Sequence, residues 1–237
     1  MQIRVGLENG IEGRSLAWAL DYPGCFAYGR DGTEALLHLP AALVRYKNWV
    51  DSCTPSSWMA DLQDFDIRLE EVFECYTIDE NFNLAKEGYE VNAWFRDDWR
   101  PLRPLEIERG LKLLAWSRQA LLELISAIPP QTLDQEHAGE RWTIRGIVRH
   151  VANAEYWCLS RLQLEAIPRE NLPEDMVDRL SLVRNRVNEV LPEMAFLQKV
   201  VGVDGEFWSP RKLLRRLLWH EKDHIEHIQK LWSSSGE

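Results

Sequence analysis

The sequence predicts an α+β protein in which a small β/α region precedes a four-helix bundle. Two observations carry this prediction. Short runs of β character dominate the first part of the 237-residue chain, whereas from Glu106 onwards the apolar residues recur with the spacing of a helix. Pro101 and Pro104 stand where the pattern changes, which indicates a linker there. We therefore expect two domains, at residues 1–104 and 105–237.

The composition is that of a globular protein with a substantial core. Apolar residues make up 45% of the chain, which includes 11 Trp, and this fraction is too high for a disordered chain. No run approaches the roughly 18 apolar residues of a membrane helix, and the N-terminal residues form a strand pattern, not a signal peptide. The cytoplasm is the expected compartment. The four cysteines are widely spaced without a C-x-x-C pair, so we expect free thiols and no disulfide framework.

The net charge of −10 arises mainly in the middle of the chain. Residues 51–104 carry 5 basic and 13 acidic side chains, whereas residues 1–50 carry 5 of each. Duplex nucleic acid is bound mainly through Lys and Arg, so this balance argues against nucleic acid as a partner. A membrane surface is disfavoured for the same reason. The acidic segment is predicted to be a solvated surface, with strands at 67–76 and 89–95.

Two strands and a helix are predicted at the start of the chain. Residues 2–8 and 14–20 have strand character and are separated by a turn-rich hairpin signal. A helix is expected from Thr33, as N-cap, to about Val50. Pro40 falls inside this helix and is expected to kink or split it. The strand at 67–76 is expected to complete the sheet of this region.

The N-terminal pattern resembles a known family. The order strand, strand, D-x-P-G-C-F-x-x-G and then a T-E-A helix start resembles the HicB-like antitoxin fold over roughly residues 1–50. That fold is a small β-sheet with one packing helix. The resemblance implies a module that binds a protein partner or acts as a sensor. The alternative interpretation is a β/α module that serves only for packing. In either case residues 51–104 are expected to form an acidic extension of this N-terminal region.

Four amphipathic helices with short connecting loops predict the bundle. Thr143 and Ser209 have the character of helix N-caps, and Pro210 stands at a favoured first helical position. The openings at 142–149 and 208–215 resemble each other, reading W-T-I-R-G-I-V-R and W-S-P-R-K-L-L-R. The predicted helices cover residues 106–128, 143–164, 176–192 and 209–232.

Histidines mark the candidate site. His220, His224 and His227 fall at about 0°, 40° and −20° around the fourth helix, so the three imidazoles share one face. Neutral imidazole is the commonest metal ligand in proteins, and an i, i+4 pair can hold one ion. The alternative is three histidines that favour the negative end of the helix dipole. His150 lies on an apolar face of the second helix, where it is either a core histidine or the third ligand.

The two histidine-bearing segments resemble the DinB superfamily. The motifs W-T-x-R-x-x-x-R-H-V-A-N-A-E and W-S-x-R-x-x-L-R-R-L-L-W-H-E-x-x-H carry this resemblance over about residues 105–237. It implies a four-helix bundle, often homodimeric, that holds a divalent metal, zinc or nickel, with three histidines. By position these are His150, His220 and His224, and His227 stands where many relatives have Gln. The resemblance also implies a low-molecular-weight thiol as co-substrate in those members that act on substrates.

The fourth helix also contains a motif of zinc peptidases. His220 to His224 reads H-E-x-x-H, in which Glu221 would be the general base. The downstream third ligand of that motif is missing, because His227 stands where a metzincin has Gly and Lys230 where it has His. A peptidase is therefore the least favoured function. Glu221 remains the candidate catalytic residue, and Asp223 is a candidate partner for an imidazole N–H.

The sequence thus predicts a metal-dependent enzyme in which the ion activates a thiol for transfer to, or elimination from, a small electrophile. S-transferase, isomerase and hydrolase types fit this description. The alternative is a non-enzymatic module in which the N-terminal region recognises a protein partner and the metal is structural or vestigial. No G-x-G-x-x-G, P-loop or G-x-S-x-G motif suggests other chemistry.

Overall fold

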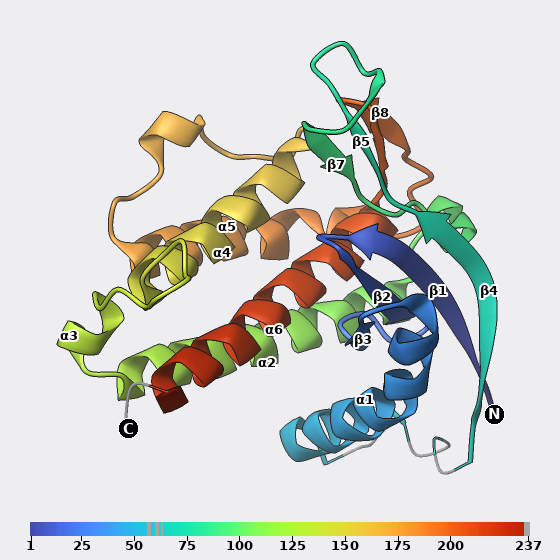
Figure 1. Ribbon diagram of the computed structural model, residues 1–237, viewed down its shortest axis with the longest axis horizontal. Coiled ribbons are helices and arrows are strands. Elements are labelled where there is room, and N and C mark those ends of the chain that lie inside the picture. The colour runs from blue at the N-terminus through green and yellow to red at the C-terminus, as the bar shows by residue number, and fades with distance from the viewer. Residues whose placement is uncertain (56–57, 60–61, 63, 235–237) are drawn as a thin grey trace. The chain divides into compact units, whose positions relative to one another are not determined.

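The computed structural model describes residues 1–55, 58–59, 62 and 64–234 (Figure 1). The chain divides into two compact units. Unit 1 comprises Met1–Arg100 and Gln198–Lys212, and unit 2 comprises Pro101–Leu197 and Leu213–Glu237. The α+β class is confirmed. The boundary near residue 100 lies close to the expected one, but the short segment at 198–212 joins unit 1, and the domains 1–104 and 105–237 stay a prediction. No helix in the described part of the chain is long and apolar enough to cross a membrane.

Unit 1 is built on a four-stranded sheet with the strand order β3-β2-β1-β4. Strand β1 pairs antiparallel with β2 and parallel with β4, and β2 pairs antiparallel with β3. The three predicted strands of this sheet are confirmed, whereas β3, inside the D-x-P-G-C-F-x-x-G motif, was not predicted. The HicB resemblance itself stays a prediction. The strands are β1 (Gln2–Ile11), β2 (Arg14–Ala19), β3 (Phe26–Gly29) and β4 (Asp66–Glu74).

Helix α1 (Gly32–Cys53) packs on this sheet and differs from its prediction in two details. Its N-cap is Asp31, whose carboxylate accepts a hydrogen bond from the Glu34 amide at 2.9 Å, and not Thr33. Asp31 is favoured because its extended backbone places the short carboxylate opposite the free amide. The helix also continues through Pro40 without a split.

Short strands complete unit 1. Strands β5 (Tyr76–Ile78), β6 (Leu84–Ala85) and β7 (Tyr89–Val91) form a three-stranded sheet, and β7 confirms part of the strand predicted at 89–95. Strands β8 (Val201–Val203) and β9 (Glu206–Trp208) form a hairpin that was not predicted. The sequence feature that indicates this hairpin is Asp204-Gly205. The φ values of these residues, 49° and 77°, suit the type I′ turn that joins two short strands. A 3-10 helix, η1 (Arg96–Trp99), lies just before Arg100, where the first segment of unit 1 ends.

Unit 2 contains the predicted four-helix bundle except for the first three residues of its last helix, which belong to unit 1 (Figure 1). Thr143 caps α4, since its Oγ1 accepts from the Gly146 amide at 3.2 Å, and the Ser209 Oγ accepts from the Lys212 amide at 3.2 Å at the start of α6. Helix α4 ends at Ser160, earlier than predicted, because Gln163 takes a left-handed φ of 58°. The helices are α2 (Pro104–Ala127), α4 (Ile144–Ser160), α5 (Met176–Val190) and α6 (Pro210–Ser234), with the short α3 (Pro130–Leu133), η2 (Arg169–Asn171) and η3 (Pro192–Met194) in the connections.

The similar openings of α4 and α6 are part of a longer internal repeat. Shifting the sequence by 66 positions aligns α2 with α5 and α4 with α6, without a gap. We infer that the bundle consists of two related helix pairs. Identical residues at this spacing include Leu114 and Leu180, Arg118 and Arg184, Gly139 and Gly205, Glu140 and Glu206, Trp142 and Trp208, Arg145 and Arg211, Arg149 and Arg215, and Glu155 and Glu221.

Candidate metal centre

Three imidazoles converge between α4 and α6. The Nε2 atom of His220 lies 3.1 Å from Nε2 of His150 and 3.2 Å from Nε2 of His224. One ring nitrogen from each of the three lies within 4.8 Å of the others, and this is the group of His, Cys, Asp or Glu side chains in the described chain that could hold a metal ion. The structure therefore brings together the three histidines that the sequence singled out from two separate helices.

The local environment keeps the imidazoles of His220 and His224 neutral. Burial lowers the pKa of His220 well below the usual value for histidine, and His224, His150 and Arg216 add to this effect. Burial also lowers the pKa of His224 to about 3, with smaller contributions from His150 and His227. A neutral imidazole keeps a nitrogen lone pair, so these rings can act as metal ligands at pH 7.

The spacing of the three nitrogens suits a metal ion. With metal–nitrogen bonds of about 2.0–2.1 Å, two ligands of a tetrahedral ion lie roughly 3.3–3.4 Å apart. The two short Nε2–Nε2 distances, 3.1 and 3.2 Å, are close to this edge length. Three neutral nitrogens packed this closely cannot all be satisfied by hydrogen bonds to one another, since each neutral ring carries a single N–H. A divalent ion satisfies all three at once.

Trp142 packs against His150, the candidate metal ligand on α4. Its ring and that of His150 are stacked, with centroids 4.5 Å apart and planes inclined by 23°. Gly146 makes room for this indole on the first turn of the helix, because a Cβ atom at Gly146 would lie 2.9 Å from Cβ of Trp142. The stack restricts rotation of the His150 ring, so we expect Trp142 to orient it toward α6.

Trp142→Leu is expected to weaken metal binding about fivefold. The reason is the loss of a ring stack worth about 1 kcal/mol, which no longer holds the His150 imidazole in its ligating orientation. Competition with a chromophoric chelator measures the change. Trp232→Leu, a partly exposed Trp at the end of α6, is the control and should leave the affinity unaltered. Equal affinities of the Trp142→Leu variant and the wild type would contradict an orienting role.

One charged side chain from each long helix meets the others in the bundle interior. Arg118 of α2 donates from Nε to Glu221 of α6 at 2.7 Å and from Nη2 to Glu155 of α4 at 2.6 Å. Arg184 of α5 donates from Nε to Glu155 at 2.6 Å and from Nη2 to Glu221 at 3.1 Å. All four residues are less than a tenth exposed. We call these four residues the Arg–Glu cluster.

The cluster has two matching halves, as the internal repeat requires. Arg118 donates from Nη1 to the carbonyl oxygen of Leu180 on α5, and Arg184 donates from Nη1 to that of Leu114 on α2. Burial opposes ionisation of Glu155, but Arg184 and Arg118 outweigh it and hold the pKa of this carboxyl below its usual value. Two positive and two negative charges therefore balance inside the bundle.

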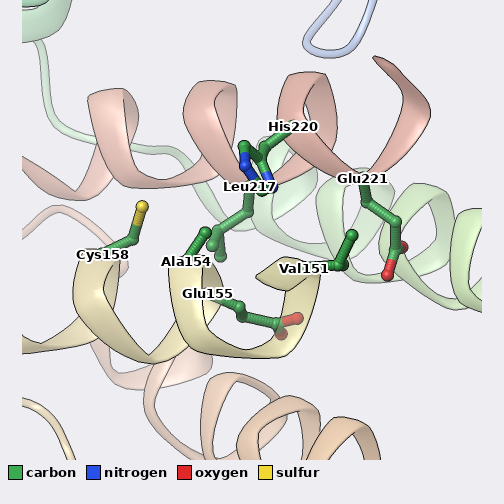
Figure 2. A pocket seen from close by; sticks show the side chains of 7 residues that line it. All are labelled: Val151, Ala154, Glu155, Cys158, Leu217, His220 and Glu221. Carbon is green, nitrogen blue, oxygen red and sulfur yellow. The ribbon is translucent and has the colours of Figure 1, made fainter. Parts of the chain in front are cut away.

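Glu221 has a structural role, because it is part of the Arg–Glu cluster. Both of its carboxylate oxygens accept hydrogen bonds from arginines. Figure 2 shows the carboxylate of Glu221 directed away from the ring of His220, its neighbour in the sequence. This placement argues against the role of general base that the H-E-x-x-H motif suggested, because a helix turns about 100° between successive residues.

The other two predicted site residues lie beside the three imidazoles and not among them. His227 Nε2 lies 3.0 Å from Oε2 of Glu140, in the loop before α4, so this ring is turned to a carboxylate. Asp223 is half-buried on α6 and is outside the metal-competent group of the described chain. The ligand role of His227 and the supporting role of Asp223 stay predictions.

A small pocket lies next to His220 (Figure 2). Its volume is about 10 Å³, which is room for about one water molecule. Ala154 and Cys158 stand 66 positions before His220 and His224, so smaller side chains occupy the repeat positions of two imidazoles. The lining residues are Val151, Ala154, Glu155, Cys158, Leu217, His220 and Glu221.

Sequence reasoning missed three members of the Arg–Glu cluster and the stacking of Trp142 on His150. Arg118, Arg184 and Glu155 were not singled out, since charged residues inside a helix normally face solvent. The signal that could have found them is the repeat, because both arginines and both glutamates recur at a spacing of 66. Trp142 was noted for its place before a helix start and not as a neighbour of His150.

Part of this chain is similar to known proteins. Residues 113–228 match the model of the DinB superfamily. A protein of Oceanobacillus iheyensis, named as a metal-dependent hydrolase by inference, is 22% identical over 156 residues, which span 55% of this chain and 88% of that protein.

Two solved structures are similar in part. The four-helix bundle protein TT2238 is 25% identical, with a TM-score of 0.42, over 52% of this chain and 98% of that chain. YfiT from Bacillus subtilis, described as an inferred metal-dependent hydrolase with an unusual four-helix bundle topology, is 16% identical, with a TM-score of 0.46, over 57% of this chain and 90% of that chain. The three histidines lie inside residues 113–228, the range that matches the DinB superfamily model and that makes up just under half of the chain.

Proposed function

We propose that this protein is a metal-dependent enzyme that acts on a small molecule. His150, His220 and His224 would hold one divalent ion, zinc or nickel. The observation that carries the proposal is the convergence of their Nε2 atoms at 3.1 and 3.2 Å, with burial keeping His220 and His224 neutral. The name of the Oceanobacillus iheyensis relative supports metal-dependent chemistry.

Three histidine ligands suit a catalytic site better than a structural one. Structural zinc sites usually have four protein ligands, whereas catalytic sites have three and leave a position for water or substrate. A bound ion would supply a Lewis acid that polarises a carbonyl or acidifies a water or a thiol. The three ligands carry no charge, so the ion would keep its full positive charge for this purpose. Trp142 would orient His150, and the Arg–Glu cluster would keep α4 and α6 in register.

Two reaction classes are compatible with this site. Hydrolysis is the class in the name of the Oceanobacillus iheyensis relative. Transfer of a low-molecular-weight thiol to a small electrophile, as S-transferase or isomerase, is what the DinB resemblance implies. The dependence of turnover on added thiol separates the two, because a hydrolase needs only water as its second substrate.

Metal analysis of the purified protein is the decisive experiment. After incubation with zinc or nickel and removal of free ion, about one ion per chain is expected in the wild type. His150→Ala, His220→Ala and His224→Ala should each lose the ion when free metal is removed, because two imidazoles bind it far more weakly than three. The cobalt form should show the visible absorption of a tetrahedral ion, which is a readout independent of activity.

Two histidine variants serve as controls. His227→Ala should keep the ion, since this ring is directed to Glu140. His38→Ala, whose Nδ1 lies 2.8 Å from the Tyr28 carbonyl oxygen in unit 1, should also keep it. A wild-type protein that binds no zinc or nickel would overturn the proposal and favour the alternative of a partner-binding module. Metal loss in His227→Ala alone would place the site elsewhere on α6.

A further inference from the structure

The internal repeat breaks down at the metal centre, and the break points to a second functional residue. Arg216 stands 66 positions after His150 and therefore occupies the repeat position of a candidate ligand. The rest of the helix opening is preserved, with Arg149 and Arg215 as the preceding pair. At two equivalent places of the repeat, one helix therefore carries an imidazole and the other a guanidinium.

Arg216 is buried without a carboxylate partner in the described part of the chain. Its exposed fraction is 8%. The guanidinium lies over the ring of Trp219, with Cζ 4.1 Å from the centroid. Its Nη1 atom is buried and has no hydrogen-bond acceptor among the described residues. Stacking on an indole fixes the plane of a guanidinium but leaves the N–H groups at its edge available.

This arrangement differs from that of Arg118 and Arg184, the two arginines of the Arg–Glu cluster. Arg118 and Arg184 each bind two carboxylates and a backbone carbonyl oxygen. A buried charge without a partner costs several kcal/mol, and its retention needs a reason. Part of the cost is offset by the cation–π contact with Trp219. The edge of the guanidinium remains unmatched, and an anionic oxygen group is the chemistry that fits it.

Arg216 is also close to the metal centre. It precedes His220 by four residues on α6, so the two side chains lie on the same face, about one turn apart. The guanidinium therefore lies on the same side of α6 as the imidazole of His220.

We propose that Arg216 binds an anionic oxygen group, carboxylate or phosphate, of the substrate beside the metal centre. This proposal rests on the proposed function for its choice of substrate as the ligand. It names the substrate class as small molecules that carry an anionic group a few bonds away from the reacting atom. The planar fork of arginine suits either anion, since it can donate two parallel hydrogen bonds.

Binding of two simple anions to the metal-free protein tests this proposal. Acetate and inorganic phosphate are the probes, observed by saturation transfer to the acetate methyl group and by broadening of the phosphorus signal. Removing the ion excludes binding of the anions to the metal itself. The wild type should bind one of the two, and Arg216→Met should weaken that binding at least tenfold. The anion that binds identifies the class of group.

The control is a second stacked arginine. Arg141 is exposed, and its guanidinium lies 4.7 Å from the ring centroid of Trp142. Arg141→Met removes the same charge from a similar stack and should change anion binding less than twofold. Equal binding by the wild type and Arg216→Met, or no binding of either anion to the wild type, would overturn the proposal.

The melting temperature separates a ligand-binding role from a structural one. Without ligand, Arg216→Met should melt at or above the wild-type temperature, because it removes an unpaired buried charge. If Arg216→Met melts at a lower temperature than the wild type, Arg216→Lys provides the test, because it keeps the positive charge. Arg216→Lys must then restore anion binding, and a failure to restore it would contradict the proposal. The metal content of each variant is measured in parallel. A wild type without metal whose anion binding depends on Arg216 would refute the proposed function but support this inference.

Discussion

Glu155→Gln is expected to lower the free energy of unfolding by about 3–5 kcal/mol, although the two side chains have the same shape. The substitution removes one of two negative charges from the Arg–Glu cluster. Arg118 and Arg184 then remain with Glu221 alone, in an interior where water cannot replace the lost partner. For a protein of this size, the expected drop in melting temperature is roughly 10 °C.

An exposed ion pair of the same unit provides the matched control. Glu108 and Lys112 lie 2.7 Å apart on α2, with 60% and 49% of their side chains exposed. Glu108→Gln should leave the melting temperature nearly unchanged, because water solvates both charges once they separate. Thermal and urea unfolding measure both variants. Similar losses for Glu155→Gln and Glu108→Gln would show that the cluster contributes no more than a surface pair.

The pH dependence of stability has a definite sign. The pKa of Glu155 lies below its ordinary value of 4.5 in the folded protein, despite burial, because of Arg184 and Arg118. The unfolded chain therefore takes up a proton at a higher pH than the folded one. The contribution of Glu155 is complete above pH 4.5 and is lost as the pH falls below it. Glu155→Gln should reduce this acid sensitivity.

Gly29→Ala is expected to destabilise unit 1 by about 3 kcal/mol or more. A Cβ atom at Gly29, the last residue of β3, would lie 2.1 Å from the backbone nitrogen of Ala35 and 2.7 Å from the carbonyl carbon of Glu34. These are backbone atoms of the first turn of α1, so no side-chain rotation can relieve the overlap. Either the strand or the helix must move, which disrupts the packing of α1 on the sheet.

Gly202→Ala is the control for this prediction. Gly202 also lies in a strand of unit 1, β8, and a Cβ atom there would meet the ring of Phe207 at 3.6 Å, which is an ordinary contact. Its melting temperature should stay within about 2 °C of the wild type, since a strand gains a little from the restricted backbone of alanine. Wild-type stability of Gly29→Ala would mean that β3 and α1 are farther apart than the structure has them.

Several features of this protein follow from contacts between neighbouring residues, and these were predictable. The start of α4 at Thr143 depends on a hydrogen bond to an amide three residues away. The shared face of His220 and His224 depends only on the helical repeat, which places residues i and i+4 together. The same holds for the apolar stripes of the helices and for the paired strands β1 and β2, which a short turn connects.

Other features depend on residues far apart in the chain. The parallel pairing of β1 with β4 joins residues more than 60 positions apart, and the strand pattern alone does not specify a neighbour. The Arg–Glu cluster joins four helices, and its burial contradicts the ordinary preference of charged side chains for water. Only the packed bundle makes this arrangement favourable, since each charge needs both partners in place before it can leave water.

The candidate metal site combines both kinds of information. The sequence by itself determined that His220 and His224 lie on one face, and it proposed His150 as their partner. The tertiary structure decided that the three imidazoles meet, that Glu221 belongs to the Arg–Glu cluster, and that His227 is directed to Glu140. The physical reason is that the spacing of residues along one helix is set by local hydrogen bonds, whereas the meeting of two helices is set by the burial of side chains from the whole bundle.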